Sequence, residues 1–395
     1  MAKNSEERKQ AVAAAAEKFA ELLHSQLDRV DEINAAGDFT DFSKLGKLVI
    51  GVCGGDGIGP MISSVSRDVL KYLLAGEIES GRVEFKAIEG LTIENRIASN
   101  KTLPEGVLEE LKSCHVILKA PTETPQAGDG RPNLESANVA MRRSLDLFAN
   151  VRPVKVPSLG IDWTFFRENT EGAYAVGSQG VKVTDDLSVD FTVTTTEGTN
   201  RIARLAYEFA RNNNKDHVTI VTKANVIKAT DGKFLNICQD MAKQYPDIKT
   251  TDWIVDIMTA DLINESRRRD FKVFILPNLY GDILTDEAAA IQGGVGTAGS
   301  ANIGKKYAMF EAIHGTAPRM IKEGRAKYAN PSSMLRASCL LLEHIGYKTQ
   351  AKTLERALDI CTLEEKKLVM TNRETGASCE QFGEYVKETI YGLTN

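Results

Sequence analysis

Short apolar segments alternate with amphipathic ones along most of this sequence. Buried strands are expected at KLVIGVC (47–53), HVILKA (115–120), HVTIVT (217–222) and KVFIL (272–276). Apolar residues at helical spacing predict helices near 61–75, 197–213, 231–245, 331–346 and 380–391. Strands that alternate with helices form at least partly parallel sheets covered by helices, so the sequence predicts an α/β fold.

The segment GVKVTDDLSVDFTVTTT, residues 180–196, interrupts this alternation. Its Val, Phe and Thr residues alternate with other residues around TDDL, a pattern typical of a β-hairpin. A hairpin inserted in an α/β chain exposes alternating side chains, which suits strand addition between subunits. We therefore expect this segment to contact a second copy of the chain.

The N-terminal segment 5–33 has a strong helical propensity. It lacks the basic start and apolar core of a secretory signal and is too acidic for a typical transit peptide. Its apolar residues step by three and four and would form one stripe of a helix: Val12, Ala16, Phe19, Leu23, Leu27 and Val30. We expect this stripe to pack on the body of the protein or on a partner subunit.

Composition excludes several classes of function. A formal net charge of -5 provides no basic field for nucleic acid or for an anionic membrane. No apolar run approaches the length of a membrane span. The six cysteines lie far apart without zinc-binding spacing, which is typical of reduced thiols that fill the core of a cytosolic protein. We expect a cytoplasmic protein that binds neither nucleic acid nor membrane.

Two aspartates stand in an otherwise mostly apolar stretch, PNLYGDILTDEAAA (277–290). Asp282 and Asp286 are four residues apart, so on a helical turn they would share one face. Like charges placed in this way repel each other unless a cation lies between them. With a third oxygen source they would suit Mg²⁺ or Mn²⁺. The alternative is an exposed loop with two solvated acids.

Three arginines lie in largely apolar surroundings: Arg142, Arg152 and Arg167. Ser136 and Asn138 precede the first of them. Arginine binds carboxylates through a bidentate fork, although a surface salt bridge can explain any single arginine. Together, the three suggest a ligand with several carboxylates.

Two further segments are candidates for ligand contacts. Lys223 directly follows the expected strand at 217–222, where ligands of parallel sheets bind, although a solvated lysine is the simpler explanation. His314 precedes Gly315 and Thr316, whose backbone could approach a phosphate. A lone histidine is more often structural than catalytic, so this assignment stays open.

Two glycine-rich stretches have the appearance of nucleotide motifs. GGVGTAG (293–299) contains G-x-G-x-x-G but follows a helical pattern rather than a strand, which argues against a Rossmann site. CGGDGIGP (53–60) follows a strand but lacks the Lys-Ser/Thr of a P-loop, and a tight glycine turn explains it equally well. Any dinucleotide site must therefore be of another kind.

Six segments taken together resemble a known family: GGDGIGP, SANVAMRRSLDLFANVRP, FRENTEGAY, KAN, NLYGDILTDEAA and HGTAP with ANP. In order and spacing they are similar to the metal-dependent decarboxylating β-hydroxyacid dehydrogenases, which act on isocitrate, isopropylmalate, homoisocitrate or tartrate. The resemblance runs from about Lys47 to the C-terminus and leaves out the N-terminal helix. It implies an isopropylmalate dehydrogenase-like, non-Rossmann fold of two α/β domains with a shared sheet region and a β-hairpin clasp.

The resemblance also implies a domain organisation. It places an N-terminal helical extension at 1–46 and a large, discontinuous cofactor-binding domain at 47–147 and 293–395. A small domain with metal and dimer contacts would comprise 148–171 and 197–292, with the clasp at 172–196.

Within this family, the residues before the first arginine largely set the substrate. Isocitrate enzymes typically carry Ser-x-Asn-x-x-x-Arg, whereas isopropylmalate enzymes place leucines there. This chain has Ser136, Asn138 and Arg142. A hydroxyl and an amide can hydrogen-bond a third carboxylate that an apolar pocket would leave unpaired. The resemblance therefore implies oxidative decarboxylation of isocitrate to 2-oxoglutarate, with 3-isopropylmalate and homoisocitrate as alternatives.

The resemblance assigns a role to each matching residue. Substrate carboxylates would be bound by Ser136, Asn138, Arg142, Arg152 and Arg167. Tyr174 matches the catalytic tyrosine, and Lys223 matches the catalytic lysine that acts across a homodimer interface. The metal, Mg²⁺ or Mn²⁺, would be held by Asp282, Asp286 and the neighbouring subunit's Asp256.

The implied cofactor site comprises Lys119, Thr124, Glu311, His314, Gly315, Thr316, Ala317, Arg319 and Asn330. NAD-using members usually carry an Asp just after HGTAP, and NADP-using members a cation. Arg319 therefore favours NADP. NAD remains open, because the insertion RMIKEGRAKYANP shifts the alignment and TNRETGAS lacks a tyrosine found in some NADP enzymes. Thr222, where many relatives have His, is a second departure.

Two functions of other kinds remain as alternatives. A Mg²⁺-dependent phosphohydrolase would need a motif such as Asp-x-Asp at an early strand end, where this chain offers only Asp56 in a glycine turn. A non-catalytic regulatory subunit of a hetero-oligomeric isocitrate dehydrogenase would usually lose a metal aspartate, the tyrosine or the lysine. This chain keeps all of them.

Overall fold

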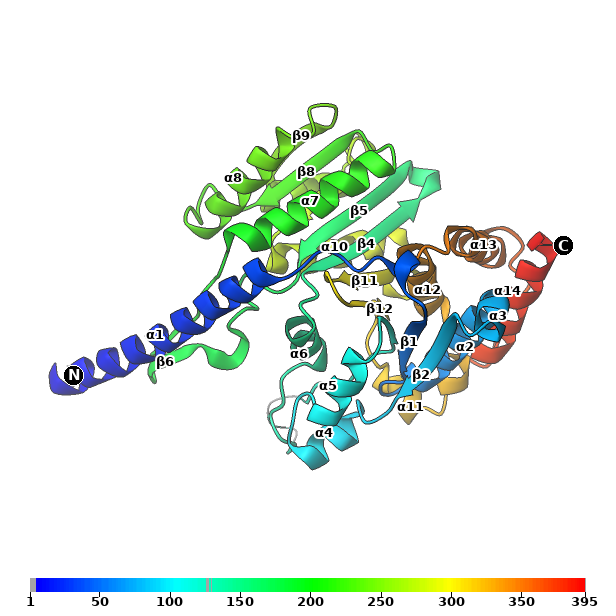
Figure 1. Ribbon diagram of the computed structural model, residues 1–395, viewed down its shortest axis with the longest axis horizontal. Helices are drawn as coiled ribbons and strands as arrows, with labels where there is room; N and C mark the ends of the chain where they lie inside the picture. The colour runs from blue at the N-terminus through cyan, green and yellow to red at the C-terminus, as the bar shows by residue number, and fades with distance from the viewer. Residues whose placement is uncertain (1–4, 126–127, 129, 395) are drawn as a thin grey trace. The chain divides into compact units, whose positions relative to one another are not determined.

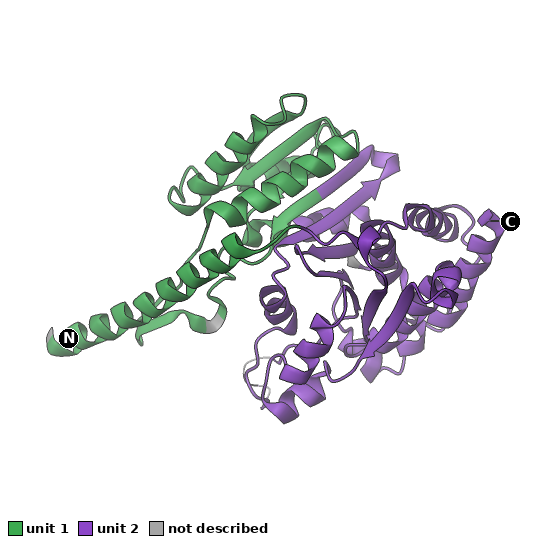
Figure 2. Cartoon of the chain, in the orientation of Figure 1, with its two compact units in different colours: residues 1–38, 165–284 green, residues 39–164, 285–395 purple. Residues whose placement is uncertain are grey.

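The computed structural model describes residues 5–125, 128 and 130–394, and the chain falls into two units (Figure 1, Figure 2). Unit 1 comprises residues 1–38 and 165–284, and unit 2 comprises residues 39–164 and 285–395. Two elements contain a boundary between the units: strand β5 (Ile161–Glu168) and helix α10 (Asn278–Gln292). Each unit combines strands and helices, and the predicted α/β class is confirmed.

Unit 2 is built on a mixed set of strands. Their order is β2 (Val83–Ile88), β1 (Leu48–Cys53), β3 (Val116–Lys119), β12 (Ala308–Ala312), β11 (Gly299–Ile303) and β4 (Ala149–Val156). β1 pairs in parallel with β2 and β3, and β12 pairs in parallel with β3. β11 runs antiparallel to both of its neighbours, β12 and β4. The direction therefore changes at the strand that follows the GGVGTAG segment.

The α-helices of unit 2 are α2 (Gly59–Leu73), α3 (Ala75–Glu79), α4 (Ile93–Ser99), α5 (Glu105–Lys112), α6 (Ala137–Ser144), α11 (Pro318–Lys322), α12 (Ser332–His344), α13 (Lys348–Asp359) and α14 (Cys379–Thr394). A π-helical turn, Ile360–Glu364, follows α13. α12 packs on β11 and β12, and α2 packs on α14. One apolar cluster joins strand and helix residues, including Leu111, Ile117, Met141 and Met309, and seats α6 against the strands.

In unit 1 the strand order is β5, β10 (Val273–Leu276), β8 (His217–Thr222) and β9 (Lys249–Ile254). β8 pairs in parallel with both β10 and β9. The helices are α1 (Ser5–Ala35), α7 (Thr196–Asn212), α8 (Thr230–Ala242), α9 (Val255–Leu262) and the first part of α10. Thr195 caps the N-terminus of α7, where its side chain accepts from the amide of Gly198, and the buried face of α7 packs on α8, β8 and β10. The predicted alternation of strands and helices is confirmed in both units.

The predicted hairpin is present as the antiparallel pair β6 (Val181–Thr184) and β7 (Leu187–Val189). These two strands form a separate small sheet, and all three residues of β7 are exposed. Helix α1 packs on β6, where Leu22 is buried with Val176 and Val181. A two-stranded hairpin is marginally stable by itself, so this cover from α1 is part of what holds it.

The N-terminal helix is confirmed, and most of its predicted apolar stripe does not pack on the described body of this chain. Val12 and Leu27 are 63% and 61% exposed, whereas Leu22 and Ile33 are 5% and 4% exposed. Phe19 stacks on Phe191 of the hairpin segment at 4.7 Å between ring centroids. The buried face of α1 is displaced from the predicted stripe, because α1 contacts the hairpin segment through Leu22. Packing of the stripe on a partner subunit stays a prediction.

The glycine-rich segments occupy the contexts that the sequence indicated. Between β1 and α2, Gly57 has φ +60°, and a Cβ there would overlap the backbone carbonyl oxygen of Thr316. This turn therefore needs glycine for close backbone approach. Gly293 and Gly294 follow α10 and precede β11, which is the reverse of the strand-turn-helix order of a dinucleotide fingerprint.

Two further observations concern the cysteines and the length of the helices. All six cysteines lie in the described part of the chain, are buried, and form no disulfide. Among the described residues, no helix is both long enough and apolar enough to cross a membrane.

Candidate active site

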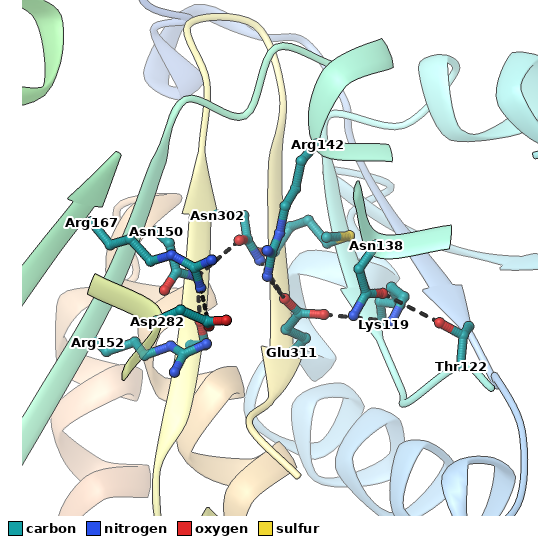
Figure 3. A network of polar contacts seen from close by, with 12 residues as sticks. Lys119, Thr122, Asn138, Arg142, Asn150, Arg152, Arg167, Asp282, Asn302 and Glu311 are labelled. Carbon is teal, nitrogen blue, oxygen red and sulfur yellow. Dashed lines mark hydrogen bonds and ion pairs between the residues drawn. The ribbon is translucent and has the colours of Figure 1, made fainter. Parts of the chain in front are cut away.

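In unit 1, the carboxylate of Asp282 contacts two predicted site residues, and Figure 3 shows its contact with Arg167. Arg167 donates from Nη1 to Asp282 Oδ1, and Tyr174 donates from Oη to Asp282 Oδ2 at 2.9 Å. The guanidinium of Arg167 also lies over the Tyr174 ring, 5.4 Å from its centroid. A predicted substrate residue, a predicted catalytic residue and a predicted metal ligand are therefore in direct contact.

Local packing fixes the direction of Arg167, which is only 1% exposed. Its Nε donates to the backbone oxygen of Asn278 at 2.9 Å, and its Nη2 donates to Asn278 Oδ1 at 2.7 Å. Gly281 permits this approach, since a Cβ there would overlap the Cβ and Cγ atoms of Arg167. The end of β5 and the first turn of α10 together hold the guanidinium.

Lys223 and Asp256 form a second contact in unit 1. Lys223 follows β8, and its Nζ forms an ion pair with Oδ1 of Asp256 in the first turn of α9. This hydrogen bond from Lys223 lowers the pKa of Asp256. Asp231 accepts from the backbone amide of Lys223 at 2.7 Å and so fixes the turn after β8. Two residues predicted to act together across an interface are thus adjacent in one chain.

In unit 2, the buried carboxylate of Glu311 gathers side chains from three other elements (Figure 3). Its Oε1 accepts from Arg142 Nη2 at 3.1 Å and from Asn302 Nδ2 at 2.8 Å. Its Oε2 accepts from Lys119 Nζ at 3.5 Å. Burial alone would raise the pKa of Glu311, but the charges of Lys119 and Arg142 outweigh it and lower this pKa to about 2. The carboxylate is therefore ionised and orients the proposed substrate arginine.

Helix α6 carries the residues expected to set substrate choice. Ser136 stands at its N-terminal boundary, and Asn138 and Arg142 are four residues apart on one face. Asn138 Oδ1 accepts from the Thr122 hydroxyl at 3.3 Å, and both side chains are half-buried. The structure thus orders one amide and one guanidinium side by side on α6.

Arg152 of β4 is 7% exposed and reaches the part of α10 that belongs to unit 2. Its Nη1 donates to Thr285 Oγ1 at 2.7 Å and to Asp286 Oδ1 at 3.1 Å. A predicted substrate arginine and a predicted metal ligand are again paired, as in unit 1.

The HGTAP segment connects β12 to α11. Ala317 has a left-handed backbone (φ 51°, ψ 56°), and the backbone oxygen of Thr316 accepts from Ile58 in the glycine turn at 3.1 Å. The ring of His314 bonds through Nδ1 to the Gly315 oxygen at 2.9 Å, and burial lowers its pKa. A histidine with a lowered pKa is neutral at pH 7. Asn330 accepts from the Ser332 amide at 2.9 Å, which helps to cap α12, and Thr124 is exposed.

Arg319, predicted to favour NADP, lies on the exposed side of α11 and its guanidinium is engaged. Its Nε donates to Glu323 Oε1 at 2.6 Å, and the side chain is 83% exposed. Glu323 also pairs with Arg325. Because this pair is exposed, an incoming anion could displace Glu323 at little cost.

The three predicted metal aspartates have the donor chemistry of a Mg²⁺ or Mn²⁺ site. Asp256, Asp282 and Asp286 offer carboxylate oxygens, their side chains are 63%, 39% and 63% exposed, and each is paired with a cation. Within either unit, the described residues do not gather three His, Cys, Asp or Glu side chains at one metal-sized point. The fit therefore rests on ligand type and accessibility.

Comparison with known proteins identifies the family. The family model described as isocitrate/isopropylmalate dehydrogenase matches residues 49–386. This chain belongs to the isocitrate/isopropylmalate dehydrogenase family. Helix α1 lies outside the matched region.

Several individual relatives of this family were found. The chain is 38% identical over 316 residues to isocitrate dehydrogenase [NADP] of Rickettsia prowazekii, covering 77% of this chain but only 61% of that protein's length. It is 32% identical to the probable isocitrate dehydrogenase [NAD] subunit alpha, mitochondrial, of Drosophila melanogaster, covering 89% of this chain and 90% of that protein. The crystal structure of isocitrate dehydrogenase from Methylococcus capsulatus superposes with a TM-score of 0.74 at 32% identity, covering 87% of this chain and 99% of that one.

The structure adds residues that pattern reading did not single out. Asn278 holds Arg167, Asn302 helps to hold Glu311, and Asp231 fixes the turn at Lys223. Asp56 is the residue that a phosphohydrolase could have used as a nucleophile. Its carboxylate instead accepts hydrogen bonds from the backbone amides of Ile93 and Glu123, at 2.8 and 2.7 Å. A buried polar residue in an apolar run was the available signal for Asn278, but its partner could not be inferred from spacing.

Replacing Glu311 by Gln should destabilise the protein by about 3 kcal/mol at pH 7, because Lys119 and Arg142 lose a buried counter-charge. The pKa of Glu311, about 2 against an ordinary 4.5, means that its contribution is complete above pH 4.5 and is lost as pH falls through 2. Urea unfolding of wild type and variant at several pH values between 7 and 2 measures this. The difference between the two proteins should shrink below pH 4.5.

Glu135→Gln is the matched control, since its pair with Arg143 is partly exposed, at 35% and 29% for the two side chains. Such a pair should contribute within about 1 kcal/mol. Equal losses in the two variants, or a Glu311→Gln difference that does not change with pH, would contradict the assigned role of the Glu311 carboxylate.

Proposed function

We propose that this chain catalyses the oxidative decarboxylation of isocitrate to 2-oxoglutarate, with reduction of NADP⁺ or NAD⁺ and dependence on Mg²⁺ or Mn²⁺. Family membership and the names of the relatives support a dehydrogenase of this kind. The observation that carries isocitrate over the alternatives is helix α6. There, Ser136, Asn138 and Arg142 offer a hydroxyl, an amide and a guanidinium, where an alkyl substrate would need apolar side chains.

Three arginines would bind the substrate carboxylates. Arg142 is oriented by Glu311, Arg152 by Thr285 and Asp286, and Arg167 by Asn278 and Asp282. Buried guanidinium groups held in this way lose little rotational freedom when a carboxylate arrives. They would fix the orientation of the substrate before any bond changes.

The chemistry needs a base and an acid, which Lys223 and Tyr174 would supply. Lys223 would take the proton of the substrate hydroxyl as hydride leaves the same carbon for the nicotinamide ring. Loss of CO₂ then leaves an enolate, whose carbon Tyr174 would protonate. The Tyr174 hydroxyl donates to Asp282, which holds its proton in a defined direction. When bound, the divalent cation would polarise the ketone oxygen.

The cofactor would be held by unit 2, through the HGTAP segment and its neighbours, with the large domain proposed at 47–147 and 293–395. The His314 ring is neutral, and the backbone of Gly315 to Ala317 offers uncharged polar groups. Such groups suit contact with an adenine nucleotide better than charged side chains would. Glu311 and Lys119 would support the cofactor site from the interior of the unit, since Glu311 is nearly fully buried and Lys119 is fully buried.

Initial rates with isocitrate, 3-isopropylmalate and homoisocitrate, each with both nicotinamide cofactors and with Mg²⁺ or Mn²⁺, test the function. We expect isocitrate to give the highest kcat/KM and a metal chelator to abolish turnover. Replacing Asn138 by Leu should lower kcat/KM for isocitrate by about tenfold or more, because the third carboxylate loses a hydrogen bond. Equal or faster turnover of isopropylmalate by the wild-type enzyme would contradict the role given to α6.

Arg319 should bind the 2′-phosphate of NADP⁺, and its ion pair with Glu323 would first have to be broken. Arg319→Asp should raise KM for NADP⁺ by roughly tenfold or more and leave KM for NAD⁺ within about twofold, since only NADP⁺ carries the extra charge. Glu323→Gln is the matched variant: it frees the guanidinium and should lower KM for NADP⁺. If Arg319→Asp impairs both cofactors equally, this residue does not discriminate between them.

The active form is proposed to be a homodimer in which Lys223 and Asp256 serve the partner's site. Exposed apolar side chains follow these two residues closely in the chain: Val226 at 66%, Ile257 at 50% and Ile263 at 62%. Exposed apolar groups around functional residues are typical of an interface. The exposed strand β7 is a further candidate for contact with the partner subunit. Cytoplasmic location stays a prediction.

Replacing Ile257 by Asp should convert the dimer into monomers, because a charge would have to be buried in an apolar contact. Light scattering after gel filtration measures the mass, and activity should fall with the dimer. Leu363→Asp is the control, since Leu363 is similarly exposed at 58% but belongs to unit 2, whereas Ile257 and Lys223 belong to unit 1. A dimer that survives Ile257→Asp would contradict the location of this interface.

A further inference from the structure

An arginine from the N-terminal helix reaches a buried loop of unit 1. Arg29 of α1 donates from Nη1 to Glu171 Oε1 at 3.1 Å and from Nη2 to Thr170 Oγ1 at 2.8 Å. The Glu171 side chain is only 3% exposed and that of Arg29 is 18% exposed. A pair buried to this extent is poorly screened, so removing one partner costs more than in an ordinary surface salt bridge.

The loop that Arg29 reaches carries two buried carboxyl groups. Glu168 accepts from the amide and hydroxyl of Thr170, both at 2.8 Å, and from the amide of Glu171 at 2.6 Å. Glu171 accepts from the Thr195 amide at 2.9 Å and from the Thr195 hydroxyl. Burial first, and then the charge of Glu171, raise the pKa of Glu168 to about 7. Two acids this close and this buried need cationic compensation.

The charged groups around this pair come from several elements. Arg29 faces Glu171 from α1, and Arg201 of α7 donates from Nη2 to Thr170 Oγ1 at 3.3 Å. Among the ion pairs of the described residues, the one that Glu171 forms is with Arg29. The compensation of Glu171 therefore comes from a helix that lies outside the region matched by the family model.

The same loop connects two proposed active-site residues. Arg167 immediately precedes Glu168, and Tyr174 follows two residues after Gly172. The backbone oxygen of Glu171 accepts from Asn278 Nδ2 at 3.1 Å, and Asn278 in turn holds the Arg167 guanidinium. A Cβ on Gly172, whose φ is +71°, would lie 3.2 Å from the Asn278 Cβ. Movement of Glu171 would therefore be transmitted to Asn278 and then to Arg167.

We propose that Arg29 is a positioning residue: by compensating the buried Glu171 carboxylate, it fixes loop 168–172 and so orients Arg167 and Tyr174. This inference rests on the proposed function of those two residues. Without Arg29, Glu171 would be a buried charge lacking its ion-pair partner, and the loop would shift to hydrate it. Helix α1 thus contributes a residue that positions the active site.

Apolar packing, rather than Arg29, anchors the helix itself. Leu22 is 5% exposed against Val176 and Val181, and Ile33 is 4% exposed. Loss of anchoring and loss of the Arg29 charge can therefore be separated by substitution. Leu22→Ala should destabilise the helix through a cavity, whereas Arg29→Ala removes the compensating charge.

The experiment measures kcat, KM for isocitrate and KM for the cofactor in wild type, Arg29→Ala, Arg29→Lys and Leu22→Ala. Arg29→Ala should raise KM for isocitrate by about tenfold and lower kcat, because small displacements of binding groups cost large factors in rate. KM for the cofactor should stay within about twofold. Arg29→Lys should recover part of the loss. Leu22→Ala should lower the melting temperature but raise KM for isocitrate less than Arg29→Ala does, because the Arg29 side chain is intact. Wild-type KM and kcat in a folded Arg29→Ala variant would overturn the proposal.

A double-mutant cycle with Glu171→Gln tests the route of the effect. If Arg29 acts through Glu171, the double variant should be no worse than the poorer single variant, and effects that multiply would overturn the proposal.

Hydrogen exchange at the amides of Thr170, Glu171 and Gly172 provides a measurement independent of turnover. Exchange should be faster in Arg29→Ala than in Leu22→Ala, and equal rates would overturn the proposal. Absence of isocitrate turnover in the wild-type protein would instead contradict the proposed function, and the exchange measurement would still decide the role of Arg29. If Arg29→Ala does not fold, Arg29→Lys and Glu171→Gln are compared in the same two measurements.

Discussion

The arrangement of candidate site residues in unit 2 depends on the hydrogen bonds and ion pairs of one ionised carboxylate, that of Glu311. It lies on β12 and accepts from Lys119 of β3, Arg142 of α6 and Asn302 of β11. Asn302 in turn accepts from Asn150 of β4 at 2.9 Å, so polar contacts cross from β3 to β4 through the interior. A buried ion pair adds little net stability compared with apolar packing, but it tolerates few alternative arrangements. Here it sets the direction of one substrate arginine.

In unit 1, a proposed substrate arginine is oriented by a neutral side chain, Asn278, rather than by a buried carboxylate. Asn278 accepts from Arg167 through two oxygens and donates to the backbone of Glu171. The guanidinium, the loop and the start of α10 are therefore oriented by one amide. Arg29 connects this arrangement to α1 through its hydrogen bonds to Glu171 and Thr170.

The proposed metal ligands share one electrostatic feature. Asp256, Asp282 and Asp286 are paired with Lys223, Arg167 and Arg152, which are the proposed base and two proposed substrate ligands. Each carboxylate thus has a cation to neutralise it. A substrate that brings carboxylates to the arginines, together with a divalent cation for the aspartates, would replace these pairs without leaving a charge uncompensated.

Much of the fold follows from the sequence, because apolar periodicity is a local property. The strands β1, β3, β8 and β10 and the helices α2, α7, α8 and α12 lie where that periodicity predicts them. Helix α1 was predicted too, but not its packed face. Its apolar residues allow two neighbouring stripes, and the contact of Leu22 with Val176 and Val181 selects one of them.

The sequence by itself determined which residue types are available for chemistry, through motifs whose members lie close together in the chain. Only the tertiary structure decided which of them are partners. Arg29 and Glu171 are 142 positions apart, Arg142 and Glu311 are 169 apart, and Arg167 and Asp282 are 115 apart. No local spacing encodes such pairs, because a buried charge finds its partner only when folding brings distant segments together and removes the water between them.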